Sequence, residues 1–317
     1  MKLTRAAMER LGVLFCALLV GSGLYGQSAA GSTQEDPNRL RVQVRLVNVF
    51  TTVTDSHGAP VGTLTRDDFH VLEDGTPQTI SVFEKESAVP LSIVLAIDTS
   101  SSTLRDMKLE IASAKRFVHS MVRPVDRLTV FQVTDEILQL TTFTADLKRI
   151  DHGIDDLHAG GGTSLYDAIV FAGEDLMDRE GRKVLVLITD GGDTTSKYDY
   201  NAALKKAQQA EAIVYSIIVV PVEADAGRNL GGEHALMQIS KDTGGKYYYA
   251  ESMAQLDDAF RQVSDELRTQ YLIAYYSNRR LADSSFRRIQ IQAAGKDADG
   301  KPYQVRHRAG YYTSSAK

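Results

Sequence analysis

The sequence lacks the residues on which several classes of protein depend. It holds a single cysteine, Cys16, among 317 residues. A disulfide within the chain is thereby excluded. Cys16 lies in the amino-terminal segment that is expected to be cleaved, so the mature protein should also lack thiol chemistry, and its stability must come from packed cores. Lysine and arginine number 36 against 41 aspartates and glutamates. The chain therefore has no excess of positive charge with which to bind nucleic acid.

Motifs of common enzyme classes are also missing. Beyond residue 30 the chain contains no GxSxG nucleophile elbow, no GxxxxGK[ST] phosphate-binding loop and no HExxH zinc motif. Residues 21–26 spell the dinucleotide pattern GxGxxG, but no strand precedes them and no helix follows, so the match is interpreted as chance. The histidines form no HxxxH pair or cluster and are interpreted as surface or packing residues.

The amino terminus has the character of an export signal. Basic residues within the first ten positions precede an apolar run over residues 11–25, and the small residues Ser28, Ala29 and Ala30 follow. The run is shorter than the roughly 20 residues of a membrane span. The sequence therefore predicts a signal peptide over residues 1–30, an exported protein that is periplasmic or secreted to the surface of a bacterium, and no stable membrane span after cleavage. A retained anchor is the alternative.

Alternation of apolar and polar residues predicts β structure towards both ends of the chain. A polar leader over residues 31–39 precedes a predicted N-terminal β arm over residues 40–89, and residues 271–317 form a predicted C-terminal β arm. Because neither arm has enough strands to bury a face alone, we expect the arms to pair into one small β-sandwich. The strands predicted in the arms cover residues 41–53, 69–73, 78–84, 271–276, 286–293 and 303–307, with the last two joined as a hairpin.

Residues 90–270, between the arms, alternate between buried strands and amphipathic helices. Residues 91–97 are a near-continuous apolar run, which is typical of a parallel strand covered on both faces. The alternation predicts an α/β fold with a doubly wound, mostly parallel sheet and right-handed crossovers. The other predicted strands cover residues 128–133, 137–143, 184–189, 213–219 and 247–249, and the predicted helices cover residues 107–121, 146–157, 165–178, 199–212, 234–243 and 256–267.

Oxygen-bearing side chains follow three segments of the predicted sheet. Asp98 ends the first strand, and Ser100 and Ser102 add hydroxyls just after it. Thr163 lies in a glycine-rich loop, and Asp190 ends the strand over residues 184–189. Ligands bind outside the carboxyl ends of parallel strands, so we expect these side chains to lie close together. All are oxygen donors, which favours Mg²⁺, or Mn²⁺ or Ca²⁺, over zinc or copper.

These five positions match a known pattern in order and in local context. Asp98, Ser100, Ser102, Thr163 and Asp190 correspond to the DxSxS, T and D elements of the metal-ion-dependent adhesion site of von Willebrand factor type A domains. About residues 90–270 resemble such a domain. The whole chain, with its exported start and the segments 64–69 and 309–312, resembles the bacterial secreted VWFA-related proteins. The resemblance implies a Rossmann-like fold and a metal at the sheet edge, whose coordination a partner's Asp or Glu completes.

The residues and the resemblance leave three function classes open. The leading hypothesis is an exported, metal-dependent protein-binding module for adhesion or interaction, which captures a partner carboxylate through Mg²⁺. The alternative is a structural or assembly component of the cell envelope with a merely stabilising metal site. A metal-dependent hydrolase is disfavoured, because no Lys, His or Glu in the three elements could act as a general base. The ligand and the oligomeric state are not identified by the sequence.

Several charged residues have two interpretations each. Asp193, three residues beyond Asp190, either bridges to the metal through water or is a solvated loop acid. Four arginines of the C-terminal arm either form a basic stripe or lie on a solvated sheet face; they are Arg287, Arg288, Arg306 and Arg308.

Overall fold

The computed structural model describes residues 46–85, 89–100, 107–220, 229–278 and 285–313. The predicted signal peptide, the leader and Ser102 lie outside these ranges. Nothing in the described part of the chain tests the predicted domain boundaries, which stay predictions.

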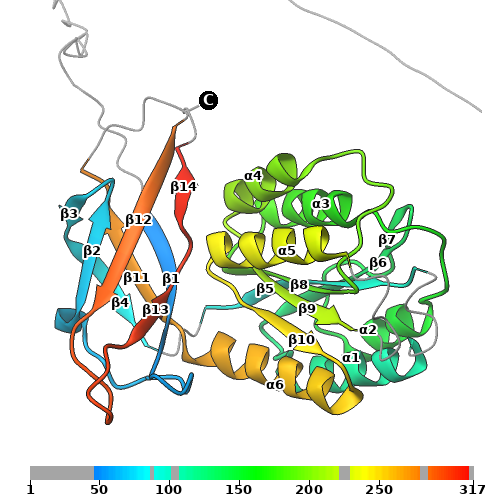
Figure 1. Cartoon of the computed structure of the whole chain (residues 1–317), viewed down its shortest axis with the longest axis horizontal. Helices are drawn as coiled ribbons and strands as arrows, with labels where there is room; N and C mark the ends of the chain where they lie inside the picture. The colour runs from blue at the N-terminus through cyan, green and yellow to red at the C-terminus, as the bar shows by residue number, and fades with distance from the viewer. Residues whose placement is uncertain (1–45, 86–88, 101–106, 221–228, 279–284, 314–317) are drawn as a thin grey trace, which may run out of the picture. The chain divides into compact units, whose positions relative to one another are not determined.

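Six strands form a central sheet in the order β10-β9-β8-β5-β6-β7 (Figure 1). All neighbouring pairs are parallel except β6 and β7, which are antiparallel. Every residue of β5 is buried, as its near-continuous apolar run predicts for a central parallel strand. The strands are β5 (Leu91–Asp98), β6 (Arg127–Val133), β7 (Ile137–Gln139), β8 (Arg182–Thr189), β9 (Ile213–Val219) and β10 (Tyr247–Ala250).

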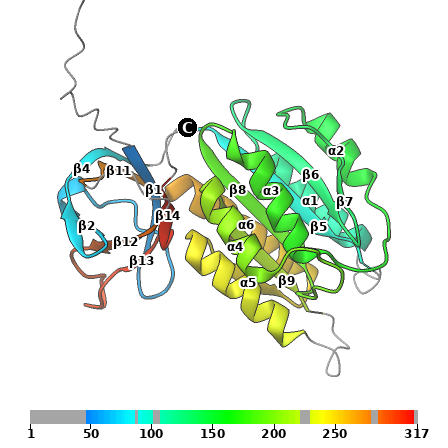
Figure 2. The ribbon, with the colours of Figure 1, turned by 90° about the horizontal axis from the view of Figure 1, so that it is seen from above.

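Helices cover both faces of this sheet (Figures 1 and 2). Ile93 and Leu95 of β5 share a core with α1, α2 and α6, whereas Val94 and Ala96 share the opposite core with α3, α4 and α5. The predicted α/β fold class with a doubly wound, mostly parallel sheet is therefore confirmed. The helices are α1 (Met107–Met121), α2 (Leu147–Asp155), α3 (Leu165–Met177), α4 (Tyr200–Ala210), α5 (Leu230–Thr243) and α6 (Met253–Thr269).

Most predicted elements of the α/β region differ from the structure by a few residues at their ends, and two have an end displaced by four residues. Of the strand predicted over residues 137–143, only β7 (Ile137–Gln139) forms a strand, and it lies at the lateral edge of the sheet. Helix α5 begins before its predicted start at residue 234, because the Asn229 side chain caps it by accepting a hydrogen bond from the Gly232 amide. The first turn of α5 carries two glycines, which masked the start of its helical pattern.

Strands from both ends of the chain form two further four-stranded sheets, in the orders β13-β1-β11-β4 and β14-β12-β2-β3 (Figure 1). Their inward side chains, among them Val49, Phe69, Ile273 and Ile289, pack into one apolar core. The strands are β1 (Leu46–Thr54), β2 (Phe69–Glu73), β3 (Thr76–Gln78), β4 (Ile80–Glu84), β11 (Tyr271–Tyr276), β12 (Phe286–Ala293), β13 (Gln304–Arg306) and β14 (Gly310–Tyr312), and a 3-10 helix, Arg66–Asp68, precedes β2.

Two strand predictions in the arms differ from the structure. The strand predicted over residues 78–84 is divided, because Gln78 pairs with Val71 in one sheet and Ile80 pairs with Tyr275 in the other. The predicted hairpin of residues 286–293 and 303–307 does not form, since β13 pairs with β1 while β12 pairs with β14 and β2. Alternation shows which side chains face a core, but it does not show which strand lies alongside.

A buried carboxylate ties the two sheets of this β region together. Glu73 is fully buried on β2 and accepts hydrogen bonds at Oε1 from Ser277 (2.6 Å) and Arg287 (3.0 Å). Its Oε2 accepts from the hydroxyls of Tyr275 (2.9 Å) and Tyr311 (3.0 Å). Burial and the Glu73 charge raise the pKa of Tyr275, so both tyrosines stay protonated donors.

The arginines of the C-terminal arm do not form a basic stripe. Arg287 is 3% exposed and paired with Glu73, Arg306 forms an ion pair with Glu266, and Arg308 is buried beside the Asn48 carbonyl. The solvated-face interpretation holds only for Arg288, which is exposed. Arg287 has the same parity along β12 as the buried Ile289 and Ile291, so the alternation places it on the core face. The expectation that failed is that an arginine on a strand faces solvent.

Buried polar contacts surround the junction at which α6 leads into β11. Glu266 accepts hydrogen bonds from the hydroxyls of Tyr215 (2.6 Å) on β9 and Thr52 (3.2 Å) on β1. Gln270, which is fully buried, accepts from Arg182 at 3.0 Å. Burial lowers the pKa of Arg182 to about 10, which still leaves it charged at neutral pH.

Glu73→Gln should lower the free energy of unfolding by about 3 kcal/mol, because it leaves Arg287 buried without its counter-charge. Urea denaturation followed by tyrosine fluorescence measures the change, with the exposed Glu84→Gln on the neighbouring strand β4 as the control. Equal midpoints for the two variants would contradict the assigned role of Glu73.

His307 should make the protein less stable in mild acid. Its Nε2 accepts a hydrogen bond from the Ile291 amide (3.0 Å), and its Nδ1 lies 2.8 Å from the Arg308 carbonyl, so these partners assign a neutral ring. Burial lowers the pKa of His307 below its usual 6.5, and the Arg308 charge adds to this. The unfolded chain therefore takes up the proton first, and stability falls as the pH drops below about 6.5.

His307→Gln keeps an acceptor for Ile291 but does not titrate, so it should lose this part of the pH dependence. Urea midpoints at about pH 7.5 and about pH 5.5 provide the comparison, with the exposed His70→Gln on β2 as the control. A pH dependence unchanged by His307→Gln would show that another group is responsible.

Candidate metal centre at the edge of the central sheet

Asp98 is the most deeply buried carboxylate of the candidate site, with 1% of its surface exposed. It lies at the carboxyl end of β5. Its Oδ1 accepts a hydrogen bond from the Ser100 amide (2.9 Å) and lies 3.5 Å from the Thr163 hydroxyl. Its Oδ2 accepts from the hydroxyl of Thr189, at 2.7 Å. Thr189 was not predicted, although its place beside Asp98 follows from the pairing of β5 with β8.

Three of the other predicted ligands, Ser100, Thr163 and Asp190, lie at the same end of the strands, and Ser102 lies outside the described residues. Ser100 and Thr163 are 3% and 4% exposed. Asp190 directly follows β8, is partly buried, and accepts a hydrogen bond from the Gly192 amide at 3.1 Å. The structure thus brings Asp98, Ser100 and Thr163 into contact and places the Asp190 charge close enough to act on Asp98.

The electrostatics of the site disfavour an ionised Asp98 in the absence of a cation. Burial raises the pKa of Asp98 to about 6, and the nearby Asp190 charge contributes to this rise. Hydrogen bonds from Thr189 and Ser100 oppose the shift but do not cancel it. The energetic cost of a buried carboxylate charge beside a second carboxylate falls when a proton or a positive ion binds.

The residues present fit a hard divalent cation. Within the described ranges, no group of three or more His, Cys, Asp or Glu side chains could hold a metal ion. A site here must therefore combine the carboxylates of Asp98 and Asp190 with neutral hydroxyls and water. Such an all-oxygen set with only two charges is typical of Mg²⁺ and unsuited to zinc or copper.

Loop contacts hold Thr163 at this edge. The Ser164 amide donates to the Thr134 carbonyl after β6 (2.7 Å), and the Gly160 amide donates to the Thr99 carbonyl after β5 (2.9 Å). A Cβ atom at Gly160 would lie 2.1 Å from Cγ2 of Thr134, so only glycine permits this approach. The glycine-rich segment is therefore held closely against the ends of two strands.

Asp193 is not a solvated loop acid. It is partly buried, and its Oδ1 accepts a hydrogen bond from the Leu165 amide at the start of α3 (2.8 Å). The sequence offered no local signal for this contact, because the helix that Asp193 caps lies far from it along the chain.

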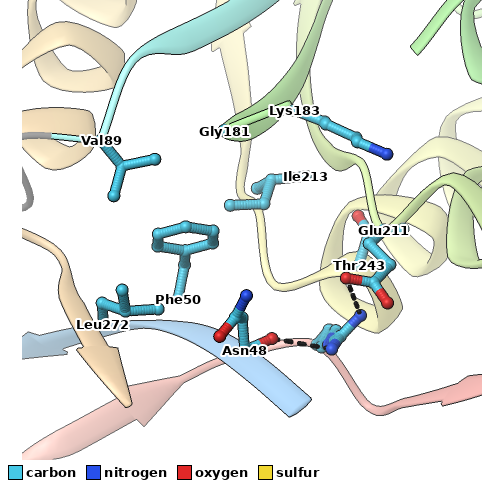
Figure 3. A pocket seen from close by; sticks show the side chains of 10 residues that line it. Asn48, Phe50, Val89, Gly181, Lys183, Glu211, Ile213, Thr243 and Leu272 are labelled. Carbon is cyan, nitrogen blue, oxygen red and sulfur yellow. Dashed lines mark hydrogen bonds and ion pairs between the residues drawn. The ribbon is translucent and has the colours of Figure 1, made fainter. Parts of the chain in front are cut away.

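A cavity of about 210 Å³ lies elsewhere, near the amino ends of β8 and β9 (Figure 3). Phe50, Ile213 and Leu272 form part of its apolar wall. Arg308 is engaged on its other side by Glu211 (3.3 Å) and the Asn48 carbonyl (2.7 Å). The cavity thus lies at the amino ends of the strands, whereas Asp98 lies at the carboxyl end of β5. The arginine that lines the cavity, Arg308, already has partners.

Comparison with known proteins identifies the family. The von Willebrand factor type A domain model matches residues 92–262, and the chain belongs to this family. A von Willebrand factor type A structure from Catenulispora acidiphila is similar in fold, with 15% identity, a TM-score of 0.50, and coverage of 78% of this chain and 73% of that chain. The vWF domain of the type V pili tip protein Mfa5 from Porphyromonas gingivalis gives 18% identity, a TM-score of 0.48, and coverage of 56% and 95%, respectively. A comparison with curated proteins gave no match.

Asp98→Asn should stabilise the metal-free protein, by up to roughly 3 kcal/mol at pH 7.5, because the amide avoids the cost of burying a charge beside Asp190. The same variant should gain no stability from added Mg²⁺. Thermal unfolding in EDTA and in Mg²⁺ measures both effects. Asp178→Asn, an exposed acid at the far end of α3, is the matched control and should behave as the wild type does. A destabilised Asp98→Asn protein in EDTA would refute this account of the site.

Proposed function

We propose that this chain is an exported protein-interaction module that binds its partner through a divalent cation. In this proposal Mg²⁺, or Mn²⁺ or Ca²⁺ in its place, is held by Asp98, Ser100, Ser102, Thr163 and Asp190. The observation that carries the proposal is the buried Asp98 carboxylate, set among hydroxyls and beside a second acid. A carboxylate of an Asp or Glu on the partner protein completes the coordination.

The chain's own residues prepare this edge for a cation. Thr189 and the Ser100 amide hold the Asp98 carboxylate in one orientation, so little ordering remains to be done on binding. Asp98 and Asp190 together balance the charge of a divalent ion, whereas the hydroxyls of Ser100 and Thr163 add none. A bound Mg²⁺ would supply a strong Lewis acid that still attracts an anionic oxygen.

Specificity must come from the surroundings of the ion. A single bridging carboxylate contributes modestly to affinity in water, since association also costs translational freedom and desolvation. The segment 193–198 lies beside the site and exposes Thr194, Lys197 and Tyr198. We infer that these side chains contribute to the choice of partner.

Binding rather than catalysis accounts best for the site. Glu233, which packs against Gly191, is 2% exposed, and its Oε2 accepts a hydrogen bond from the Tyr249 hydroxyl at 2.9 Å. It is therefore held in place and closed off from solvent, unlike a general base poised to accept a proton from water. Membership of the von Willebrand factor type A family also supports this proposal, because Asp98, Ser100, Ser102, Thr163 and Asp190 match the adhesion-site pattern of such domains.

Export belongs to the same proposal and rests on the signal-like residues 1–30. Across the described ranges, no helix combines the length and apolar character needed to cross a bilayer.

Selection of displayed random peptides on the purified protein in Mg²⁺ should enrich peptides with an Asp or Glu that is essential for binding. Changing that acid to its amide should weaken binding at least tenfold, or by about 1.4 kcal/mol. Binding should also be lost in EDTA and in Asp98→Ala and Asp190→Ala. Asp178→Ala, which removes an exposed acid away from the site, should retain it.

Two results would count against the proposal. Peptide binding that is indifferent to EDTA would remove the cation from the interaction. Tight Mg²⁺ binding in calorimetry with no selection for acidic peptides would instead favour a structural role for the metal.

A further inference from the structure

Two loops at the candidate metal centre are joined through their main chains. The amides of Thr194 (2.9 Å) and Thr195 (3.2 Å) both donate to the Thr163 carbonyl. In return, the Thr163 amide donates to the Thr194 hydroxyl at 2.9 Å. A Cβ atom at Gly162 would lie only 2.8 Å from Cγ2 of Thr195, so glycine allows the loops to approach this closely. The loop that carries Thr163 is thus fixed to the loop that follows Asp190.

The same pairing supplies the amino-terminal cap of α3. Ser164 stands at the N-cap position but makes no side-chain capping bond. Instead, Asp193 Oδ1 accepts from the Leu165 amide at 2.8 Å, and Ser196 Oγ accepts from the Tyr166 amide at 3.0 Å. Ser196 also donates to Asp193 Oδ1 at 2.5 Å, which joins the two capping groups. Amides of the first turn, which have no acceptor within the helix, therefore donate hydrogen bonds to side chains of a distant segment.

Helix α3 reciprocates this contact. Asp167 is buried in its first turn, and its Oδ1 accepts from the amides of Lys197 and Tyr198, both at 2.9 Å. The Tyr198 ring then packs edge-on against Phe171 at a centroid distance of 6.4 Å. We call residues 193–198, with these bonds to α3, the α3 clamp.

The α3 clamp links the two segments that carry the proposed metal ligands Thr163 and Asp190. Asp193 lies three residues after Asp190, and its capping target, Leu165, lies two residues after Thr163. The cap made by Asp193, which is not one of the proposed ligands, is therefore one of several contacts that hold the segment of Thr163 near Asp98, where Thr163 Oγ1 and Asp98 Oδ1 are 3.5 Å apart.

We propose that Asp193 is a positioning residue of the metal centre, which holds Thr163 and Asp190 in register by capping α3 from the neighbouring loop. The metal part of this inference rests on the proposed function; the positioning part concerns the chain without metal. Asp193 acts here through its acceptor oxygen, so an amide in its place serves equally well.

Mg²⁺ affinity of three variants tests the metal part, measured by calorimetry on the full protein. Asp193→Ala should weaken Mg²⁺ binding by about tenfold or more, as loss of a residue that orients ligands does. Asp193→Asn should restore it. Asp199→Ala removes the cap of α4, where Asp199 accepts from the Ala202 amide at 2.8 Å, and should lose comparable stability without changing Mg²⁺ affinity.

The outcomes separate positioning from the alternatives. If Asp193→Asn binds Mg²⁺ as weakly as Asp193→Ala, the residue acts through its charge and the inference is overturned. It is equally overturned if Asp199→Ala weakens Mg²⁺ binding as much, because the effect is then one of general stability.

Amide hydrogen exchange in EDTA tests the positioning part without metal. Residues 160–167 should exchange faster in Asp193→Ala than in the wild type, and at wild-type rates in Asp193→Asn and Asp199→Ala. Unchanged exchange in Asp193→Ala refutes the inference whatever the Mg²⁺ result. If the wild-type protein binds no Mg²⁺, the proposed function fails, while this exchange comparison still decides whether Asp193 positions the loop.

Discussion

The burial of one carboxylate at the end of a central strand is the constraint on which the candidate site depends. Asp98 ends a strand that is covered on both faces, so its charge is removed from bulk water. Parallel pairing of β5 with β8 places Thr189 against it and Asp190 just beyond. The pKa of Asp98 is raised because burial and the nearby Asp190 charge make ionisation of this carboxyl costly, and we propose that a bound divalent cation offsets this cost while both acids stay ionised.

Polar contacts in several parts of the molecule have a feature in common: a polar group of one segment is hydrogen-bonded by a segment far away in the sequence. Asp193 caps α3, Glu73 receives hydrogen bonds from strands of the C-terminal arm, and Glu266 joins α6 to β1 and β9. Such contacts favour one arrangement of strands and loops, because a slip would leave a desolvated charge without its partner.

The sequence was informative wherever a pattern repeats locally. The apolar run of β5 and the helical spacing in α1 and α6 predicted the central sheet and its helices, and the Rossmann-like topology then predicted that Asp98 and Asp190 share an edge. The roles of Thr189, Asp193 and Arg287 depend instead on which strand or helix lies alongside. Since alternation encodes only the face that a side chain occupies, such cross-chain contacts required the folded structure.

We propose that Asp98, Thr163 and Asp190 surround a divalent cation, whose coordination a carboxylate of the partner completes. Anomalous diffraction from crystals of the protein grown with Mn²⁺ is the most direct test of this proposal. We expect an anomalous peak among these three side chains, and we expect it to disappear in Asp98→Ala. Crystals at saturating Mn²⁺ that show the three side chains together, with no anomalous peak among them, would contradict the proposal.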